Sequence, residues 1–365
     1  MQQDLGIALV GCGRIAQKYS QIFTEGQLDG ARLVGVCDLR AERAEKLASR
    51  HDVPAFADYH DMMKTLGDAV DVVCILTESG LHARHMTDLA PYRKHIVVEK
   101  PMALTLDDAD RMIQAADENA IKLFVVKQNR YNMPVVKLRE AMEAERFGKL
   151  VMGTVRVRWC RTQEYYDQDA WRGTWASDGG VFANQASHHI DLLEWMLGRP
   201  VSVFAKSRTA LVDVECEDTG VAVITFESGA LGIVEATTAT RPKDLEGSIS
   251  ILGATGTVEI GGFAVNEMKI WNFQDAVEGD ARVLTDFREN PPNVYGFGHL
   301  AYLRDVVHSV RNGLPSLVDG LEGRKSLQLI TAMYESIETG KEVSLHFRPR
   351  FSKLGQARQD ETVKD

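Results

Sequence analysis

Over about the first 125 residues, short apolar segments alternate with longer amphipathic ones, and no other feature limits the possible folds so strongly. The apolar segments are rich in β-branched residues and comprise 7–10, 31–37, 71–76, 95–100 and 122–127. Apolar residues recur at helical spacing in the stretches between them, which include 15–23, 41–51, 81–89 and 106–119. Strands that alternate with helices predict βαβ units and a parallel sheet that is covered on both faces.

Beyond about residue 150 the pattern changes to period two. Apolar and polar residues alternate here, with turn sequences such as ESGA and GATG, in the segments 151–161, 220–228, 230–240 and 248–262. Consecutive strands of this kind predict a mostly antiparallel sheet. Two later helices are expected at 297–312 and 321–338. We therefore expect an α/β domain over 1–148, on which the late helices can pack back, an α+β domain over 149–350 and a polar tail over 351–365.

The composition argues against several classes of protein. The chain has 365 residues, 44% of them hydrophobic, which favours two domains over one. Its formal net charge of −10 argues against a general nucleic-acid or membrane-surface binder. We see neither a signal peptide nor an apolar run long enough to span a bilayer. Five cysteines without a CxxC pair are typical of buried thiols in a reducing compartment, so we expect a cytoplasmic protein.

The sequence GCGRIA lies between the first predicted strand and the first helix. Gly11 permits a tight turn, Gly13 lets the backbone approach a pyrophosphate, and Ala16 lets the helix pack closely on the strand. Arg14 and Ile15 open the helix, whose N-terminus offers unpaired N–H groups and the positive end of its dipole. We expect the first four of these residues to bind a dinucleotide.

The second predicted strand is followed by Asp38, some 20 residues after the glycine motif. An acid at this place accepts hydrogen bonds from the ribose hydroxyls of the cofactor and repels a 2′-phosphate. The sequence therefore predicts NAD as the cofactor. Arg40 leaves NADP as the alternative, because a nearby arginine can pair with that phosphate.

The strand at 95–100 ends in the sequence EKP. Ligands of open parallel sheets bind at the carboxyl ends of the strands. Pro101 fixes its own φ and favours an extended backbone at Lys100, so we expect the Lys100 ammonium over the edge where a nicotinamide would lie. Glu99 is expected on the opposite side, near a backbone group or a sugar hydroxyl. The alternative is a solvated lysine, as at most strand ends.

Further polar residues follow neighbouring strands at the same edge. Thr77 is expected to touch the ribose or nicotinamide side of the cofactor. Gln128, directly after the strand predicted at 122–127, is a further expected cofactor contact. His82 is a candidate cofactor contact, although a histidine in a first helical turn is more typical of capping or packing than of catalysis. His85 lies one turn later, but no acid or cysteine accompanies the pair, so we expect no metal site.

In the second domain, the glycine pair at 179–180 forms a loop ahead of a predicted helix. Asn184, His188 and Asp191 are expected to project from the start of this helix, with Ser187 beside them. Asn184 and His188 share a face if the helix has begun by residue 184. The alternative for two adjacent histidines is a surface pair at a helix start.

Arginine and aromatic residues gather in two stretches, KQNRYN and WCRTQEYYDQDAWRG. Arginine pairs with carboxylates and phosphates through two hydrogen bonds, and aromatic faces pack on sugars or bases. An anionic substrate is one interpretation, and a solvated edge of mixed charge is the other. The candidate pocket residues are Gln128, Arg130, Tyr131, Arg161, Trp171 and Arg172.

These motifs resemble the glucose–fructose oxidoreductase, inositol dehydrogenase and MocA family. The resemblance is carried by GCGRIA, EKP and the N-x-x-x-H-x-x-D run from Asn184, and it covers nearly the whole chain. It implies a Rossmann domain, a second domain with a large, open, mainly antiparallel sheet, and hydride transfer between NAD(P) and a hydroxyl of a sugar or polyol. It assigns catalysis to Lys100 and His188. Many members have aspartate at the position of Asn184, so we expect Asn184 to hydrogen-bond substrate without transferring a proton.

The strings KQNRYN, NQASHHIDLLEWMLG and VYGFGH are similar to those of members that oxidise the 3-hydroxyl of UDP-N-acetylglucosaminuronic acid for bacterial surface polysaccharides. The resemblance therefore implies this nucleotide sugar as substrate, contacted by the pocket residues together with Lys100, Asn184, Ser187 and His188. Lys100 is expected to stabilise charge on the reacting oxygen and His188 to accept its proton, although these roles can be reversed.

Two other functions stay open at this point. One is an enzyme of the same family that acts on inositol or a neutral hexose. The other is a non-catalytic NAD-dependent sensor, against which the retention of both Lys100 and His188 argues. The open sheet implied by the family also predicts a homodimer or homotetramer, because a large exposed sheet face favours burial.

Overall fold

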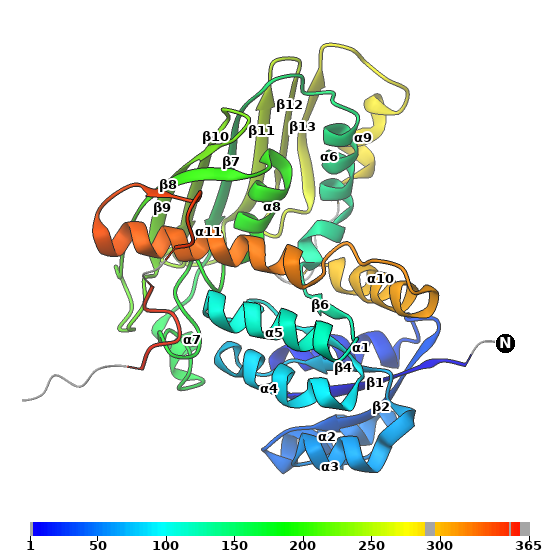
Figure 1. The fold of residues 1–365 in the computed structure, drawn as a ribbon. Helices are drawn as coiled ribbons and strands as arrows, with labels where there is room; N and C mark the ends of the chain where they lie inside the picture. The colour runs from blue at the N-terminus through cyan, green and yellow to red at the C-terminus, as the bar shows by residue number, and fades with distance from the viewer. Residues whose placement is uncertain (1–2, 289–295, 350–351, 358–365) are drawn as a thin grey trace, which may run out of the picture. The chain divides into compact units, whose positions relative to one another are not determined.

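The computed structural model describes residues 3–288, 296–349 and 352–357. The chain divides into two compact units (Figure 1). The first unit comprises Met1–Tyr131 and Phe297–Lys325, and the second comprises Asn132–Gly296 and Ser326–Asp365.

The division after Tyr131 differs from the joint expected at residue 148. The helix between these positions, α6 (Met133–Glu143), packs against β12 (Gly256–Gly261) and so belongs with the second unit. Helix α10 (Gly298–Asn312) returns to the first unit. Most of the polar tail expected from residue 351 lies outside the described residues.

The first unit contains a six-stranded, fully parallel sheet, as the alternating pattern predicts. Its order is β3-β2-β1-β4-β5-β6, so the winding direction reverses between β1 and β4. Such a reversal opens a crevice at the carboxyl ends of the strands, where ligands bind. The strands are β1 (Leu5–Val10), β2 (Ala31–Cys37), β3 (Ala55–Phe56), β4 (Val72–Ile75), β5 (His95–Val98) and β6 (Leu123–Val125).

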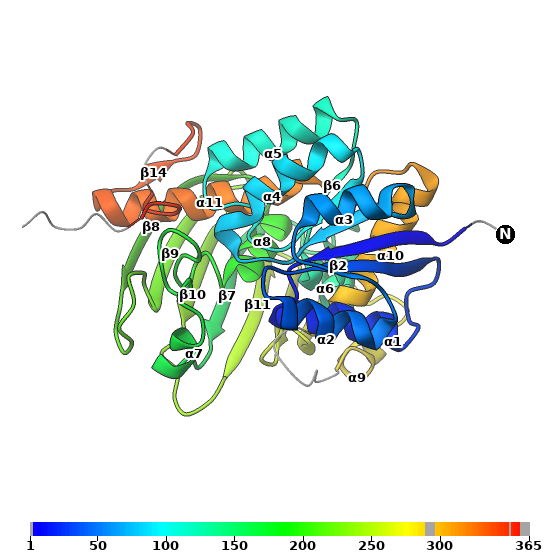
Figure 2. The ribbon, with the colours of Figure 1, turned by 90° about the horizontal axis from the view of Figure 1, so that it is seen from below.

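Helices cover both faces of this sheet (Figure 2). On one face lie α1 (Arg14–Thr24) and α2 (Ala41–His51), and on the other lie α3 (Tyr59–Leu66), α4 (His82–Leu89) and α5 (Leu106–Glu118). Short 3₁₀ turns complete the unit: η1 (Gly67–Ala69), η2 (Ser79–Leu81), η3 (Ala90–Tyr92) and η4 (Gln128–Tyr131).

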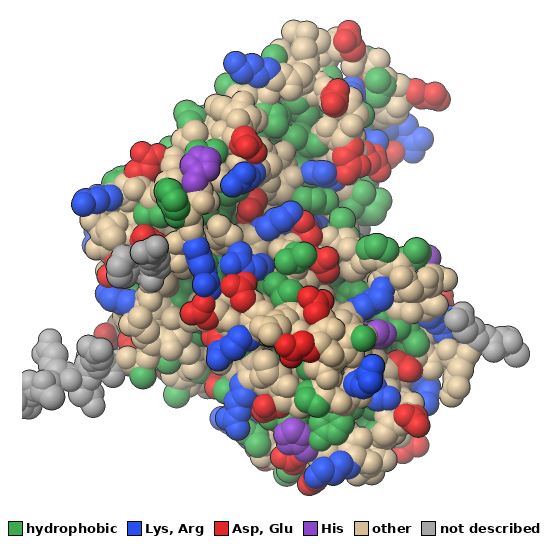
Figure 3. Space-filling model, viewed as in Figure 1, with side chains coloured by type: hydrophobic (Ala, Val, Ile, Leu, Met, Phe, Trp, Pro, Cys, Tyr) green, Lys and Arg blue, Asp and Glu red, His purple; other side chains and the backbone are tan. Residues whose placement is uncertain are grey.

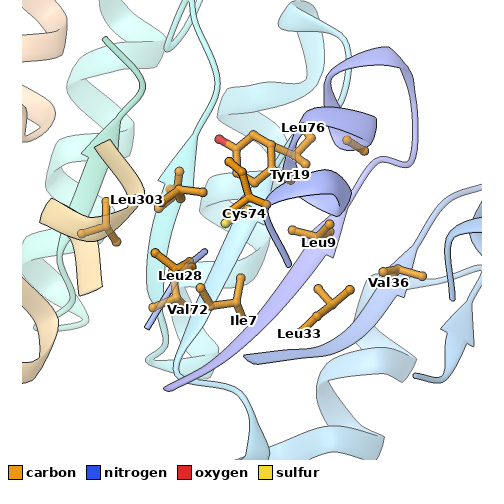
Figure 4. Close-up of a cluster of buried hydrophobic side chains, with 14 of the residues drawn as sticks. Ile7, Leu9, Tyr19, Leu28, Leu33, Val36, Val72, Cys74, Leu76 and Leu303 are labelled. Carbon is orange, nitrogen blue, oxygen red and sulfur yellow. The ribbon is translucent and has the colours of Figure 1, made fainter. Parts of the chain in front are cut away.

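The core of the first unit joins its sheet to α1, α2 and α10 (Figure 4). Ile7 and Leu9 of β1, Cys74 of β4 and Tyr19 of α1 lie in one buried cluster with Leu303 of α10. Each of these five side chains is at most 1% exposed. Burial of such side chains contributes about 1.5–3 kcal/mol each, which fixes the strand ends that carry the polar residues.

The second unit contains an eight-stranded mixed sheet in the order β13-β12-β11-β7-β10-β9-β8-β14. All neighbours run antiparallel except β7 and β10, which are parallel. The mainly antiparallel sheet expected from the sequence is therefore confirmed. Its strands are β7 (Leu150–Arg158), β8 (Pro200–Arg208), β9 (Thr219–Phe226), β10 (Leu231–Thr237), β11 (Glu246–Gly253), β12, β13 (Glu267–Phe273) and β14 (Val343–Ser344).

One face of this sheet is packed and the other is open. Helix α8 (Ser187–Leu197) contacts β7, β10 and β11. On strand β9 the residues alternate between buried and exposed, and Val221 and Val223 are each 50% exposed. The remaining helices are α7 (Gln163–Asp167), α9 (Asp280–Asp286) against β13, and α11 (Gly320–Thr339), which crosses the division between the units.

The surface chemistry agrees with an acidic protein of mixed charge. Basic and acidic side chains are interspersed on the face that Figure 3 shows. Within the part of the chain that the structure describes, no helix combines the length and apolar character needed to cross a membrane.

Candidate active site

The loop between β1 and α1 has the geometry of a phosphate-binding turn. Gly11 has φ +98°, and a Cβ on it would lie 2.8 Å from the backbone carbon of Leu76. A Cβ on Gly13 would meet no atom within 4 Å among the described residues. Helix α1 begins at Arg14, and within the described structure its N-terminus has neither a side-chain cap nor an acid in the first turn. The first turn of α1 therefore fits an anionic pyrophosphate.

Asp38 lies beside this loop, at the end of β2. Its Oδ2 accepts a 2.7 Å hydrogen bond from the backbone N–H of Cys12, and its Oδ1 accepts a 2.9 Å hydrogen bond from the backbone N–H of Arg40. The carboxylate thus sits next to the loop, where an acid serves the ribose of a dinucleotide. The Arg40 side chain is exposed, and the preference for NAD over NADP stays a prediction.

At the end of β4, Thr77 is held from both its side chain and its backbone. Its hydroxyl lies 3.0 Å from Nδ1 of His85, and its carbonyl oxygen lies 3.0 Å from Nε2 of His82. The pKa of His85 is lowered to about 4, mainly by burial, so this ring is neutral near pH 7. Among the described residues no group of three potential ligands forms a metal site.

At the end of β5, Glu99 enters a buried network and not a solvent-facing one. Its carboxylate accepts hydrogen bonds of 3.2 Å from the hydroxyl of Tyr19 and 3.2 Å from the backbone N–H of Lys100. Nε2 of His299, on α10, lies 3.6 Å away. Glu99 is 6% exposed, whereas Lys100 is only partly buried. The backbone contact expected for Glu99 is present, and Glu99 anchors the chain beside Lys100.

The turn η4 follows β6 at the same edge. Gln128 is 4% exposed, and its amide oxygen has no hydrogen-bond partner among the described residues. Arg130 pairs with Glu322 at 3.1 Å, and the hydroxyl of Tyr131 donates a 2.8 Å hydrogen bond to Asp305. The amide oxygen of Gln128 is therefore buried at this edge, and its contact with a cofactor stays a prediction. The polar ends of Arg130 and Tyr131 have partners within the first unit.

In the second unit, Asn184 lies in a turn before α8, because the helix begins only at Ser187. The helix has therefore not begun by residue 184, so the condition for Asn184 and His188 to share a helical face is not met, and the expectation that Asn184 projects from the helix is wrong. The Asn184 amide instead donates to the buried carboxylate of Asp178, and the Ser187 hydroxyl donates a 3.0 Å bond to the Asn184 carbonyl. These bonds fix the turn directly ahead of His188.

His188 and His189 have different surroundings. His188 is 6% exposed, in the first turn of α8. His189 is fully buried against Trp159, with 5.7 Å between the ring centroids, and burial lowers its pKa to about 3. A surface pair of histidines is therefore excluded, and His189 serves as a neutral packing residue.

Glu217 supports the glycine turn that leads to this helix. Its carboxylate accepts hydrogen bonds from the backbone N–H of Phe182 at 3.1 Å and the hydroxyl of Tyr334 at 2.8 Å. A Cβ on Gly180 would lie 2.0 Å from the Glu217 carboxylate, so any larger residue there would displace this carboxylate. Neither Glu217 nor Tyr334 belongs to a motif that the sequence reveals.

Arg161 and Arg172 stack on the same tyrosine of α7. The Cζ atom of Arg161 lies 5.3 Å from the ring centre of Tyr165, and that of Arg172 lies 4.6 Å from it. Arg172 also stacks on Trp171 at 4.6 Å. Asp244 pairs with the first guanidinium at 2.9 Å, and Asp169 with the second at 3.1 Å. The structure therefore brings together three of the candidate pocket residues, Arg161, Trp171 and Arg172, with both arginines already paired.

A phosphate-binding turn at the switch point of a parallel sheet, with an acid after β2, defines a dinucleotide-binding oxidoreductase class. Two family models match the chain: "Oxidoreductase family, NAD-binding Rossmann fold" over residues 5–127 and "Oxidoreductase family, C-terminal alpha/beta domain" over residues 139–345. The chain belongs to this glucose–fructose oxidoreductase, inositol dehydrogenase and MocA family of oxidoreductases, and its cofactor is NAD.

Solved structures include two close matches. WlbA dehydrogenase from Chromobacterium violaceum, in complex with NADH and UDP-GlcNAcA, is 41% identical with a TM-score of 0.87, and the match covers 94% of this chain and 97% of that one. WlbA from Bordetella pertussis, with the same two ligands, is 39% identical with a TM-score of 0.87, covering 94% and 98%.

Two further relatives are inositol dehydrogenases. Myo-inositol 2-dehydrogenase of Thermotoga maritima is 27% identical over 349 residues, which is 93% of this chain and 98% of the relative. The scyllo-inositol 2-dehydrogenase of Bacillus subtilis is 23% identical over 96% of this chain and 99% of its own length.

Proposed function

We propose that the protein is a sugar dehydrogenase that oxidises the 3-hydroxyl of UDP-N-acetylglucosaminuronic acid to the 3-keto sugar with NAD. The observation that carries this proposal is the likeness to two WlbA dehydrogenases, at 41% and 39% identity over 94% of this chain. Both were crystallised with NADH and UDP-GlcNAcA. The product is a precursor of bacterial surface polysaccharides such as lipopolysaccharide.

The reaction removes a proton from oxygen and a hydride from carbon. NAD, when bound, supplies the hydride acceptor. We assign to Lys100 the stabilisation of negative charge that develops on the reacting oxygen, and to His188 the acceptance of its proton, since imidazole titrates near neutral pH. The two residues belong to different units, so their shared role follows from the family resemblance.

Each unit contributes part of the support for catalysis. In the first, Glu99 accepts a hydrogen bond from the backbone N–H of Lys100, which holds the backbone beside the ammonium. In the second, Asn184 and Ser187 form a bonded turn immediately before His188. A fixed backbone at both residues favours a catalytic pair over a sensor that only binds NAD, because orientation contributes to rate and not to cofactor affinity.

The substrate carboxylate and diphosphate require cationic partners, for which the stacked Arg161 and Arg172 are the candidates. The Cζ atoms of both guanidiniums lie near the ring of Tyr165, and Arg172 also donates a 2.7 Å hydrogen bond to the Tyr165 hydroxyl. A guanidinium can donate two parallel hydrogen bonds to a carboxylate or phosphate. Asp169 and Asp244 neutralise them in the absence of substrate. An anionic ligand would compete with these carboxylates for the guanidiniums. Arg172 is the leading candidate for pairing with the carboxylate of the substrate.

Inositol oxidation is the second candidate function. It is favoured by the two inositol dehydrogenases that match along more than nine-tenths of the chain, although at only 27% and 23% identity. A neutral polyol would not require the paired arginines. The two candidates therefore differ in whether a negative charge on the substrate is needed.

The open face of the second sheet supports assembly into a homodimer or homotetramer. Phe204 and Val223 are cross-strand neighbours on this face, exposed to 39% and 50%, and Leu231 on β10 is 46% exposed. Arg158 and Glu235 pair on it at 2.6 Å. An apolar patch with paired charges of this kind suits a second copy of the same surface.

A screen of nucleotide sugars and polyols tests the proposed function. The protein is incubated with NAD and each compound, and reduced nicotinamide is read by its absorbance. We expect the fastest reduction with UDP-N-acetylglucosaminuronic acid. Preference for myo-inositol would replace the proposal by the second candidate, and the absence of turnover with every compound would favour the sensor.

A further inference from the structure

His82 lies between the chain segments that follow two neighbouring strands. It is the first residue of α4 and is 1% exposed. Nδ1 of its ring lies 2.8 Å from the carbonyl oxygen of Pro101, and Nε2 lies 3.0 Å from that of Thr77. One side chain thus reaches Pro101, the residue after Lys100, and Thr77, two residues after the end of β4.

The ring chemistry decides which contact is the stronger. Carbonyl oxygens only accept hydrogen bonds, and a neutral imidazole has one N–H to donate. Burial is the largest influence on the pKa of His82 and lowers it, and the charge of Lys100 lowers it further. The two backbone carbonyls and Glu99 raise the pKa, but the net effect is a lowered value. The ring is therefore neutral near pH 7, and we assign its proton to Nδ1, which makes the shorter contact, to Pro101.

We propose that His82, at the start of α4, is a positioning residue that fixes the Lys100 backbone through a hydrogen bond to the carbonyl of Pro101. This inference rests on the proposed function for the catalytic role of Lys100. It changes the role expected for His82 from a direct cofactor contact to a buried tie between two strand ends.

The tie acts together with a second one on the other side of Lys100. The carboxylate of Glu99 accepts from the Lys100 N–H, while the His82 ring donates to the carbonyl of the next residue. The backbone at Lys100 is therefore held on both sides by buried side chains, 6% and 1% exposed respectively. Loss of either bond leaves the Lys100 backbone free to shift, and a shift of about 1 Å in a reacting group can cost ~10² in rate.

Two substitutions separate the two ring contacts. In His82→Asn the amide nitrogen takes the place of Nδ1, so the bond to Pro101 is retained. In His82→Gln the amide nitrogen takes the place of Nε2, so the bond to Pro101 is lost and the donor faces the carbonyl of Thr77. Leu89→Ala, at a residue of the same helix that is 1% exposed, is a matched control that weakens the packing of α4 without touching either carbonyl.

The first measurement does not depend on substrate. Lysines are methylated with a ¹³C-labelled reagent, and the Lys100 signal is assigned by its loss in Lys100→Arg. We expect this signal to shift in His82→Gln and to keep its wild-type position in His82→Asn and Leu89→Ala. An unchanged signal in His82→Gln, or equal shifts in all three variants, would overturn the inference whatever the substrate is.

The second measurement uses turnover of UDP-N-acetylglucosaminuronic acid. We expect His82→Gln to lower kcat by about 10- to 100-fold at an unchanged Kd for NAD, and His82→Asn to recover most of it. A positioning role would be contradicted if kcat fell equally in both histidine variants. It would also be contradicted if the fall in kcat merely paralleled the fall in melting temperature, as expected for Leu89→Ala. A wild-type protein without turnover would reject the proposed function alone, since the lysine signal still tests the tie.

Discussion

The hydroxyl of Tyr334 donates a 2.8 Å hydrogen bond to Oε1 of Glu217, and this pair supports the turn ahead of His188. The same carboxylate oxygen accepts from the N–H of Phe182, and the N–H of Gly180 lies 3.3 Å from the tyrosine hydroxyl. All of these groups are buried in the second unit. The turn is thus held by side chains that are distant from it in sequence.

Tyr334→Phe removes one bond to a buried carboxylate and leaves the backbone N–H of Gly180 without its partner. We expect it to lower the free energy of unfolding by about 1–3 kcal/mol, measured by urea denaturation. Tyr302→Phe is the matched control, because the buried Tyr302 hydroxyl has no hydrogen-bond partner among the described residues. Equal losses in the two variants would show that the Glu217 bond contributes nothing specific.

Glu217 also predicts a pH dependence of stability. Burial raises the pKa of Glu217 from 4.5 to about 7, with Asp178 adding to the effect. Between these pH values the folded chain retains a proton that the unfolded chain releases, so the free energy of unfolding falls as pH rises. The fall is on the order of 3 kcal/mol at most.

Glu217→Gln is expected to remove this part of the slope, since its amide cannot titrate. The measurement compares urea unfolding of wild type and variant at several pH values from 4.5 to 7, the window set by Glu217. Glu45→Gln, at an exposed position of α2, controls for the change in net charge. Parallel curves for the Glu217 variant and wild type would contradict the raised pKa.

Asp38 predicts the choice of cofactor. Its carboxylate repels the 2′-phosphate of NADP, so NAD is expected to bind more tightly, and Asp38→Ala is expected to narrow the difference. Titration calorimetry with both cofactors measures this. Since Asp38 also accepts from the N–H of Cys12, some loss of NAD affinity is expected as well. Tighter binding of NADP by the unaltered protein would reject the prediction.

Lys100→Met and His188→Asn test the assigned catalytic pair. Removing an oriented donor to a developing oxyanion costs about 10²–10³ in kcat, so Lys100→Met is expected to lower kcat by this factor and to leave the Kd for NAD nearly unchanged. His188→Asn is expected to lower kcat similarly and to alter its pH profile. Near-normal turnover in either variant would remove that residue from the mechanism.

Arg172→Met tests the recognition of a carboxylate. The ratio of kcat/KM for UDP-N-acetylglucosaminuronic acid to that for UDP-N-acetylglucosamine is expected to fall, because only the sugar with a carboxylate can compete with Asp169 for the Arg172 guanidinium. Arg161→Met, on the other side of Tyr165, is the matched comparison. If the ratio stays constant in both variants, neither arginine reads the carboxylate.

Much of the fold could be predicted because local pattern and tertiary structure agree. The apolar run at 31–37 is strand β2 residue for residue, and the helical pattern at 41–51 is α2. Strand β3 has only two residues, too few to show a period, and α3 was missed although Asp58 caps it through the N–H groups of His60 and Asp61. Strand β8 was also missed; it begins at Pro200, a first strand position at which proline is tolerated.

The candidate site divides in the same way. Gly11 and Asp38 were predictable because the phosphate turn is a local motif with a fixed context. Glu217 lies in the acidic segment 213–218, and such a segment is typical of a solvent-exposed surface. Its burial depends on a hydrogen bond from Tyr334, more than 100 residues later in the chain. The start of α8 after Asn184 was missed because the turn is set by Asp178, a contact that helical spacing does not reveal.

The origin of the transferred hydride tests the central claim most directly. UDP-N-acetylglucosaminuronic acid carrying deuterium only at C3 of the sugar is incubated with the protein and NAD, and the reduced cofactor is analysed by mass spectrometry. The proposed function predicts that the reduced cofactor gains one mass unit relative to the product from unlabelled sugar. Reduced cofactor without deuterium, or no reduction at all, would contradict oxidation at the 3-hydroxyl.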